Sequence, residues 1–351
     1  MKTYSDKRLS LEIIRIIALI FVIFNHTGEN GFELFRCAES KWIWEMSIFI
    51  DLICKAGVPL FFMVSGVLLL GRNEGIIDIL RKRILRYLII IVIFSFMYYV
   101  ILYISHPEYG FSLVYFVKYI YSNPFIVPYW FLYSYVEFFI LLPVLRAIIK
   151  GLDESGYLFL AIVGILSCYV IVIEQILGLE HINISIVIIN NTIFYPIIGY
   201  GIANKFSKKL FSLRLFLVAI CLLIVNYICA LYMNKVEYMS VGECSGKYID
   251  AFALIPAIII FYLIIYYTEK RNSQHIWKNE RVICYIGGCT FVTYLFEDML
   301  RSKLFIHLFD ITSNQLLGLF LCIPYIAGIM ISGCITATII RKIPVINKLK
   351  L

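Results

Sequence analysis

Apolar residues form long runs along the whole chain, and short polar or basic segments separate them. A helix needs roughly 20 mainly apolar residues to cross a bilayer. By this criterion the sequence predicts ten membrane-spanning helices, near residues 9–27, 47–70, 84–104, 125–145, 157–177, 186–203, 215–233, 249–268, 282–300 and 315–340. The sixth is the weakest, because Asn190, Asn191 and Pro196 interrupt it. We therefore expect an all-α, polytopic transmembrane bundle that forms one integral-membrane domain over residues 1–351, without an extramembrane domain.

The composition supports a membrane protein and argues against a soluble one. Hydrophobic residues make up 62% of the chain and charged residues only 15%, whereas soluble domains have roughly 45–50% and about 25%. The first apolar run carries Glu12 and Arg15 and is not followed by a small-residue cleavage site, so we expect a retained helix rather than a signal peptide. Most of the ten cysteines lie inside apolar runs, and no metal-ligand spacing appears, so we predict no metal site.

The distribution of basic residues predicts the orientation of the bundle. The net charge is +8, and most of the 31 Lys and Arg residues fall on one side of the ten predicted helices. They cluster in both termini and in the segments 71–86, 146–150, 205–214 and 270–281. Since cytoplasmic loops carry an excess of Lys and Arg, both termini are predicted to be cytoplasmic. We therefore attribute the net positive charge to the orientation of the chain in a lipid bilayer, and we expect no nucleic-acid partner.

Ionisable residues inside the predicted helices are candidates for function, because burying them in lipid is costly. They are Glu12, Arg15, His26, Asp51, Lys55, Glu137, Glu297 and Asp298. Arg15 and His26 are eleven residues apart, which is three helical turns plus about 20°, so both lie on one face roughly 16 Å apart. Histidine is the usual general base for a hydroxyl, and the arginine fork suits phosphate or an oxyanion. Alternatively, Arg15 extends to the membrane surface and His26 caps a helix end.

Two further groups of charges have both a structural and a functional interpretation. Asp51 and Lys55 have the i, i+4 spacing of a helical ion pair, and we favour that structural role for them. The cluster of Arg81, Lys82, Arg83 and Arg86 determines topology first. It could also attract an anionic cytoplasmic ligand such as a nucleotide.

Several segments resemble the acyltransferase 3 family of membrane O-acyltransferases. The residues that carry the resemblance are Arg15-x10-His26, GVPLFFMVSGVLLL (57–70), RKRILRYL (81–88), WFLYSYVEFFILLP (130–143) and GGCTFVTYLFEDMLR (287–301). They occur in the family's order and cover essentially the whole chain. Two positions differ from the family pattern: Glu297 stands where a histidine is common, and Glu137 is offset from a carboxylate pair.

The resemblance implies transfer of an acyl group, usually acetyl, from cytoplasmic acetyl-CoA to a hydroxyl of an extracytoplasmic or lipid-linked carbohydrate at the cell membrane. It implies Arg15 and His26 as catalytic residues, with Glu297 as a third candidate. Ser65, Arg83 and Arg86 are then expected to bind the donor, whereas Glu137, Asp51 and Lys55 are further polar residues within the membrane. No separate cofactor or metal is expected, and the oligomeric state is left open.

Two other functions are compatible with the same residues. The chain could export a saccharide or a lipid-linked saccharide, with His26 and the buried carboxylates as a proton relay. It could also be a non-catalytic assembly subunit. Internal repeats, which are common in secondary transporters, are not evident, and this argues against the exporter.

Overall fold

All the regular elements in the described part of the chain are helices. The structure is a computed structural model that describes residues 4–106, 108, 110–122, 124, 126–179, 190–206, 213–272, 279–305 and 307–343. The helices are α1 (Tyr4–Asn25), α2 (Lys41–Cys54), α3 (Gly57–Leu69), α4 (Ile76–Ile79), α5 (Leu85–Ser105), α6 (Leu113–Ser122), α7 (Trp130–Gly151), α8 (Glu154–Leu177), α9 (Phe194–Gly201), α10 (Leu213–Val241), α11 (Lys247–Ala251), α12 (Leu254–Asn272), α13 (Glu280–Leu304) and α14 (Gln315–Ile340). The expected all-α bundle is confirmed for these ranges.

Seven helical stretches in the described ranges are long and apolar enough to cross a membrane. They are Lys41–Leu69, Ile76–Ser105, Val127–Gly151, Glu154–Leu177, Phe216–Val241, Glu280–Ile311 and Gln315–Ile340. The apolar part of α12, Leu254–Thr268, is shorter, and α1 is not among the seven. Part of the predicted sixth helix, 186–203, lies outside the described residues. The count of ten spans and the sides of the termini therefore stay predictions.

The second predicted helix, 47–70, is not one continuous helix. It begins earlier, at Lys41, and it divides into α2 and α3 at Lys55 and Ala56. Pro59 lies in the first turn of α3, and its lack of an N–H means that the carbonyl of Lys55 cannot receive the usual helical hydrogen bond.

The basic segment that was predicted as a loop is largely helical. The helix of the third span begins at Ile76, because α4, a π-helical segment over Leu80–Ile84 and α5 follow one another without a gap. Arg81, Lys82 and Arg83 therefore project from a helix, which agrees with the high helix propensity of Arg and Lys. Only the segment 70–75 connects this helix to α3.

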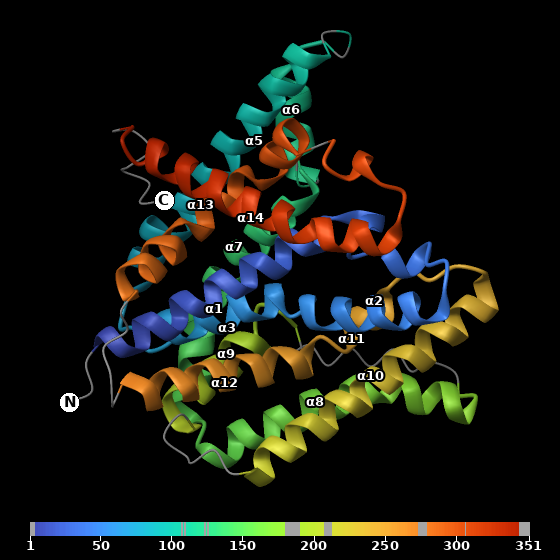
Figure 1. The fold of residues 1–351 in the computed structure, drawn as a ribbon. Helices are drawn as coiled ribbons and strands as arrows, with labels where there is room; N and C mark the ends of the chain where they lie inside the picture. The colour runs from blue at the N-terminus through green and yellow to red at the C-terminus, as the bar shows by residue number, and fades with distance from the viewer. Residues whose placement is uncertain are drawn as a thin grey trace.

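Helix α1 lies near the middle of the bundle, where it packs against α3, α12 and α13 (Figure 1). On the far side of α12 lie α8 and α10, whereas α5 and α6 extend away from the centre (Figure 1). Helices α3 and α9 cross closely, because a Cβ at Gly66 would lie 2.0 Å from the carbonyl oxygen of Pro196, and one at Gly199 would lie 2.5 Å from that of Met63. Small residues allow such close helix packing in membranes.

The beginning of α1, the beginning of α13 and the end of α14 meet at one end of the bundle. A Cβ at Gly287 would lie 2.4 Å from Oε2 of Glu12. Arg341, which follows α14, donates to the carbonyl oxygen of Gly288 at 2.5 Å. The first and last helices thus have their terminal ends on the same side of the bundle. Lys82, Arg83 and Arg86 line one cavity there together with Gly287 and Gly288.

Candidate active site

A histidine and a glutamate form a direct pair at the end of α1. His26 follows the last residue of α1, and its Nδ1 lies 2.8 Å from Oε2 of Glu297 on α13. Glu297 is only 1% exposed. A carboxylate can only accept hydrogen bonds, so an ionised Glu297 holds the imidazole with its proton on Nδ1 and leaves Nε2 as an acceptor. The sequence named both residues as candidates, and the structure brings them together across 271 positions.

His26 lines a polar cavity of about 440 Å³, which we call the histidine cavity. Its neighbour Asn25 also lines this cavity, as do polar side chains from four other segments: Lys55, Trp130, Asn191 and Asp250. Trp130 is 41% exposed and offers an aromatic face. The cavity therefore combines one candidate base with several hydrogen-bonding groups and an aromatic surface.

The predicted ion pair between Asp51 and Lys55 is wrong. Lys55 Nζ lies 2.5 Å from Oδ1 of Asp250 on α11, and 4.9 Å from the centre of the Phe32 ring. Lys55 follows the last residue of α2, and its side chain lines the histidine cavity, where Asp250 supplies a carboxylate. Asp51 is fully buried, and neither carboxylate oxygen has a hydrogen-bond partner among the described residues.

A second cavity, of about 340 Å³, is lined by cationic side chains, and we call it the basic cavity. Its charged residues are Arg15, Lys82, Arg83 and Arg86, and Ser65 also lines it. Arg15 Nη1 lies 3.1 Å from Oε1 of Glu12, and Lys82 Nζ lies 2.7 Å from Oδ1 of Asp78. The residues expected to bind the donor thus share one cavity, whereas His26 lies in the other.

Ser65 is fixed by hydrogen bonds within the wall of the basic cavity. Its hydroxyl donates to the carbonyl oxygen of Phe61 at 2.9 Å, and the Tyr135 hydroxyl lies 2.6 Å from Ser65 Oγ. Ser65 is therefore placed to orient Tyr135 and the backbone of α3 at the cavity surface.

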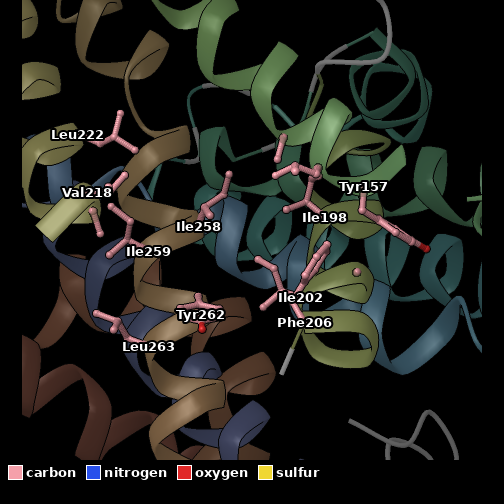
Figure 2. A pocket seen from close by; sticks show the side chains of 14 residues that line it. Tyr157, Ile198, Ile202, Phe206, Val218, Leu222, Ile258, Ile259, Tyr262 and Leu263 are labelled. Carbon is pink, nitrogen blue, oxygen red and sulfur yellow. The ribbon is translucent and has the colours of Figure 1, made fainter. Parts of the chain in front are cut away.

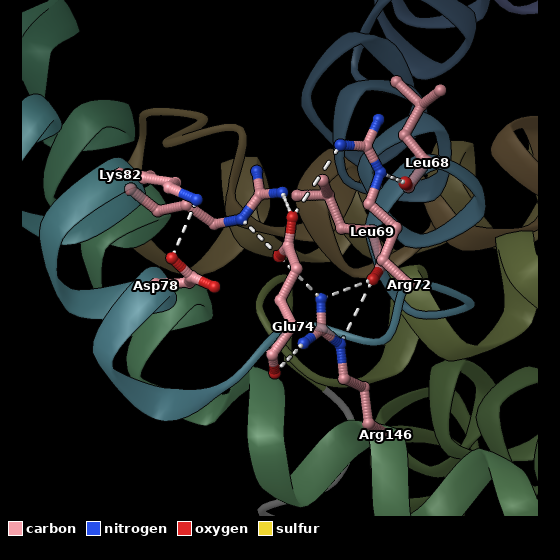
Figure 3. A network of polar contacts seen from close by, with 8 residues as sticks. Leu68, Leu69, Arg72, Glu74, Asp78, Lys82 and Arg146 are labelled. Carbon is pink, nitrogen blue, oxygen red and sulfur yellow. Dashed lines mark hydrogen bonds and ion pairs between the residues drawn. The ribbon is translucent and has the colours of Figure 1, made fainter.

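Glu74, which the sequence reasoning missed, organises the arginines next to the basic cavity. Arg83 binds both of its carboxylate oxygens, at 2.9 Å through Nε and 2.5 Å through Nη2. Arg146 Nη2 lies 3.0 Å from Glu74 Oε2 and also donates to the carbonyl oxygen of Leu69 at 2.9 Å (Figure 3). The hydrogen bond from Arg83, reinforced by Arg146 against the opposing effect of burial, lowers the pKa of Glu74 to about 2.

Three aromatic side chains separate the two cavities. Phe61 of α3, Phe131 of α7 and Tyr294 of α13 line both of them. The ring centres of Phe61 and Phe131 are 5.6 Å apart, and those of Phe131 and Tyr294 are 5.3 Å apart. We call these three residues the aromatic partition.

Two sequence candidates lie away from both cavities. Glu137 is exposed on the surface of α7, and its Oε1 accepts a hydrogen bond from Thr192 at 3.2 Å. Asp51 lines neither cavity. The structure therefore gives no contact between these two residues and the His26–Glu297 pair.

A third cavity, of about 320 Å³, is largely apolar, and its wall contains two tyrosines, Tyr157 and Tyr262, but no histidine, carboxylate or basic side chain (Figure 2). It lies between α8, α9, α10 and α12, and Leu158, Ile198, Val218 and Ile258 are typical of its lining. Its chemistry offers neither a general base nor an anion site. Among the described residues, no group of three or more His, Cys, Asp or Glu could hold a metal ion.

The model of the acyltransferase 3 family, described as an acyltransferase domain, matches residues 8–340. The chain belongs to this family. No curated protein and no solved structure matches the chain. Together with its apolar helices, membership of the acyltransferase 3 family makes the chain a multi-pass membrane acyltransferase.

The segments that carry the family resemblance converge on the site. Phe61 belongs to GVPLFFMVSG, Phe131 to WFLYSY and Tyr294 to TFVTYLFE. The same segments contribute Ser65 to the basic cavity and Glu297 to the histidine pair. Glu297 stands where the family resemblance leads one to expect a histidine, and it contacts His26, which follows α1.

Proposed function

We propose that this acyltransferase moves an acetyl group from acetyl-CoA in the basic cavity to a carbohydrate hydroxyl in the histidine cavity. One observation carries the proposal: a carboxylate-bound imidazole lines a polar cavity that only an aromatic partition separates from a cationic cavity. The arrangement provides an anion site and a general base at the two ends of one path. The match to an acyltransferase family favours this function over saccharide export.

The charge of the basic cavity supports a coenzyme A thioester as the donor. Its cations come from α1 and from the helix over Ile76–Ser105, so they approach the cavity from two directions. Phosphates bind arginine through charge-assisted, often bidentate hydrogen bonds. Arg15 lies in this cavity rather than beside His26, which favours donor anchoring over stabilisation of the reacting oxygen.

The lining of the histidine cavity supports a carbohydrate as the acceptor. Sugars present many hydroxyls and weakly polar C–H faces, so they are held by planar polar side chains and by aromatic surfaces. Asn25, Asn191 and Asp250 supply polar groups, and Trp130 supplies an exposed aromatic ring. A purely apolar acceptor would leave the remaining hydrogen-bonding capacity of these groups unused, which is costly.

His26 acts as the general base in this proposal, and Glu297 positions it. The free Nε2 takes the proton of the acceptor hydroxyl while its oxygen bonds to the thioester carbonyl carbon. The carbon–sulfur bond then breaks, and the imidazolium returns the proton to the leaving thiolate. Glu297 holds the Nδ1 proton and stabilises the imidazolium between the two steps.

The proposed orientation places the basic cavity on the cytoplasmic side of the cell membrane, with both termini on that side and residues 1–351 as one integral-membrane domain. The excess of Lys and Arg in the segments predicted to be cytoplasmic supports this orientation. The donor then enters from the cytoplasm, and the acceptor enters from the opposite side or from the lipid.

Acetyl transfer by the purified protein tests the function directly. Labelled acetyl-CoA and a panel of neutral hexose and deoxyhexose oligosaccharides are supplied to the protein in nanodiscs. His26→Ala should lower kcat by roughly 10²–10⁴-fold, and His26→Gln should be nearly as poor, because an amide cannot take the proton. His307→Ala is the matched control, since His307 also pairs with a carboxylate, Asp310, at 2.8 Å but is exposed.

Near wild-type transfer by a well-folded His26→Ala protein would remove the catalytic assignment. Rescue of activity by Gln, with a loss of protein yield for Ala, would indicate a structural histidine. Saccharide movement across the membrane without acetyl transfer would instead support an exporter.

A further inference from the structure

The aromatic partition lies between the two cavities. Phe61, Phe131 and Tyr294 are the residues that both cavities share. If the donor phosphates are held among the arginines and the acceptor lies beside His26, the acyl carbonyl must pass this partition. The sulfur, which is bonded to the carbonyl carbon, then lies between the rings within reach of the histidine cavity, and the phosphates of coenzyme A stay in the basic cavity.

Two members of the partition are firmly held. Phe131 packs against Phe62 and Tyr135, with ring centres 5.5 Å and 4.8 Å away. The Tyr294 hydroxyl donates to the carbonyl oxygen of Pro128, so its ring is fixed at both ends. Both side chains are buried.

Phe61 is the member that has room to move. Its side chain is only half-buried, and it reaches Phe131 in a tilted ring contact at 5.6 Å. The Phe61 carbonyl is fixed by Ser65 at 2.9 Å, so motion would involve the ring and leave the backbone in place. A rotation of this ring would open a passage whose width the other two rings limit.

We infer that Phe61, Phe131 and Tyr294 determine the length of the acyl chain and keep water of the histidine cavity from the waiting thioester. This inference rests on the proposed function and deepens it. An acetyl group occupies little space between the rings, whereas each added methylene must fit beside them in a densely packed wall. A closed wall also suppresses hydrolysis, in which water would attack the thioester carbonyl and release acetate and free coenzyme A.

Enlarging the passage should therefore broaden the acyl specificity. With acetyl-, butyryl- and hexanoyl-CoA as donors, the wild-type protein should prefer acetyl-CoA. Phe61→Ala should raise the hexanoyl-to-acetyl ratio of kcat/KM by about tenfold or more, a change of the size that a pocket gains or loses with a few methylenes. It should also increase the release of free coenzyme A in the absence of acceptor, measured by chromatography.

Two substitutions on the same helix serve as controls. Leu68 lies two turns from Phe61 and lines only the basic cavity, and Val58 lines only the histidine cavity. Leu68→Ala and Val58→Ala enlarge one cavity each without thinning the partition, so both should keep the wild-type acyl-length ratio. If Phe61→Ala does not fold, Phe61→Leu should give a smaller shift in the same direction.

The outcomes separate this inference from the proposed function. Wild-type transfer of acetyl groups with an unchanged length ratio in folded Phe61→Ala would overturn the inference alone. Equal use of acetyl- and hexanoyl-CoA by the wild type would also overturn it. Absence of transfer from every thioester would overturn the proposed function and the inference with it.

Discussion

In the histidine cavity one imidazole meets one buried carboxylate, whereas beside the basic cavity three arginines surround one carboxylate. The Nδ1 atom of His26 is bound to Glu297, so Nε2 is the ring nitrogen that can accept a proton from a substrate. Arg72, Arg83 and Arg146 all lie within 3.8 Å of Glu74, so that group keeps an excess of positive charge. The first region is arranged for one proton, and the second for an extended anion.

The number of cations alone does not define an anion site. Arg15, Lys82 and Arg83 each have an acidic partner, Glu12, Asp78 and Glu74 respectively. An incoming phosphate must exchange these partners or bind to the remaining charge. The carboxylates thus hold the basic side chains in place, and in the proposed function this lowers the entropic cost of donor binding.

The largest effect among the following predictions is expected for Glu297. Glu297→Gln should lower kcat by roughly 10–100-fold, because the amide no longer stabilises the imidazolium and can favour the wrong tautomer. The pH profile of kcat should change as well, because the variant loses a negative charge beside the base. The pH profile of kcat distinguishes positioning from mere packing.

A folded Glu297→Gln protein with an unchanged kcat and pH profile would show that the pair has no role in transfer. Asp310→Asn is the matched control, because it removes the carboxylate from the exposed His307 pair. It should leave both measurements unchanged.

A smaller effect is expected for the cations of the basic cavity. Replacing both Arg83 and Arg86 by Gln should raise KM for acetyl-CoA by about tenfold and change kcat less. In the proposed function, these arginines contact the donor far from the reacting carbonyl. Arg281→Gln, at the exposed first turn of α13, is the control. An unchanged donor KM in the correctly inserted double variant would leave these arginines with a topological role alone.

The smallest effect is expected for Glu74 and concerns stability. Its folded-state pKa, about 2, lies below the ordinary value of 4.5, so its ionised form stabilises the protein above that value, and the contribution is lost as the pH falls toward 2. Glu74→Gln should lower Tm at pH 7 by roughly 2–4 °C. The difference in Tm between wild type and variant should shrink below about pH 4.

A constant difference in Tm across this pH range would contradict the assignment to charge. A pKa of about 2 also means that the charge of Glu74 does not change near neutral pH, so Glu74 should not contribute to any pH dependence of transfer there.

The candidate catalytic residues could be predicted from the sequence, because a charge inside an apolar run is a strong local signal. Arg15, His26 and Glu297 stood out for that reason, and the all-helical class followed from the length of the runs. The pairing of His26 with Glu297 could not be predicted, since it depends on how α1 and α13 pack across 271 positions. The family resemblance named both positions but not their contact.

The wrong prediction for Lys55 and the missed aromatic residues each have an identifiable cause. The helical turn from Asp51 to Lys55 is intact, since the Lys55 N–H donates to the Asp51 carbonyl oxygen at 2.8 Å. Lys55 instead pairs with Asp250, and this long-range contact could not be predicted from the local spacing. The residues of the aromatic partition were missed because Phe61 and Phe131 look like ordinary apolar residues in a membrane helix. Their position within the segments that resemble the family was the only indication of a functional role. That role becomes visible only from the two cavities that these residues line.

The most direct test of transfer between the two cavities uses proteoliposomes with membrane-impermeant substrates. Acetyl-CoA is placed on one side, and an oligosaccharide that serves as an acceptor for the purified protein is placed on the same side or on the opposite side. If the cavities open toward opposite membrane faces, product should form only when donor and acceptor are on opposite sides, and His26→Ala should abolish it. Acetylated product with both substrates on the same side of intact vesicles would contradict the account.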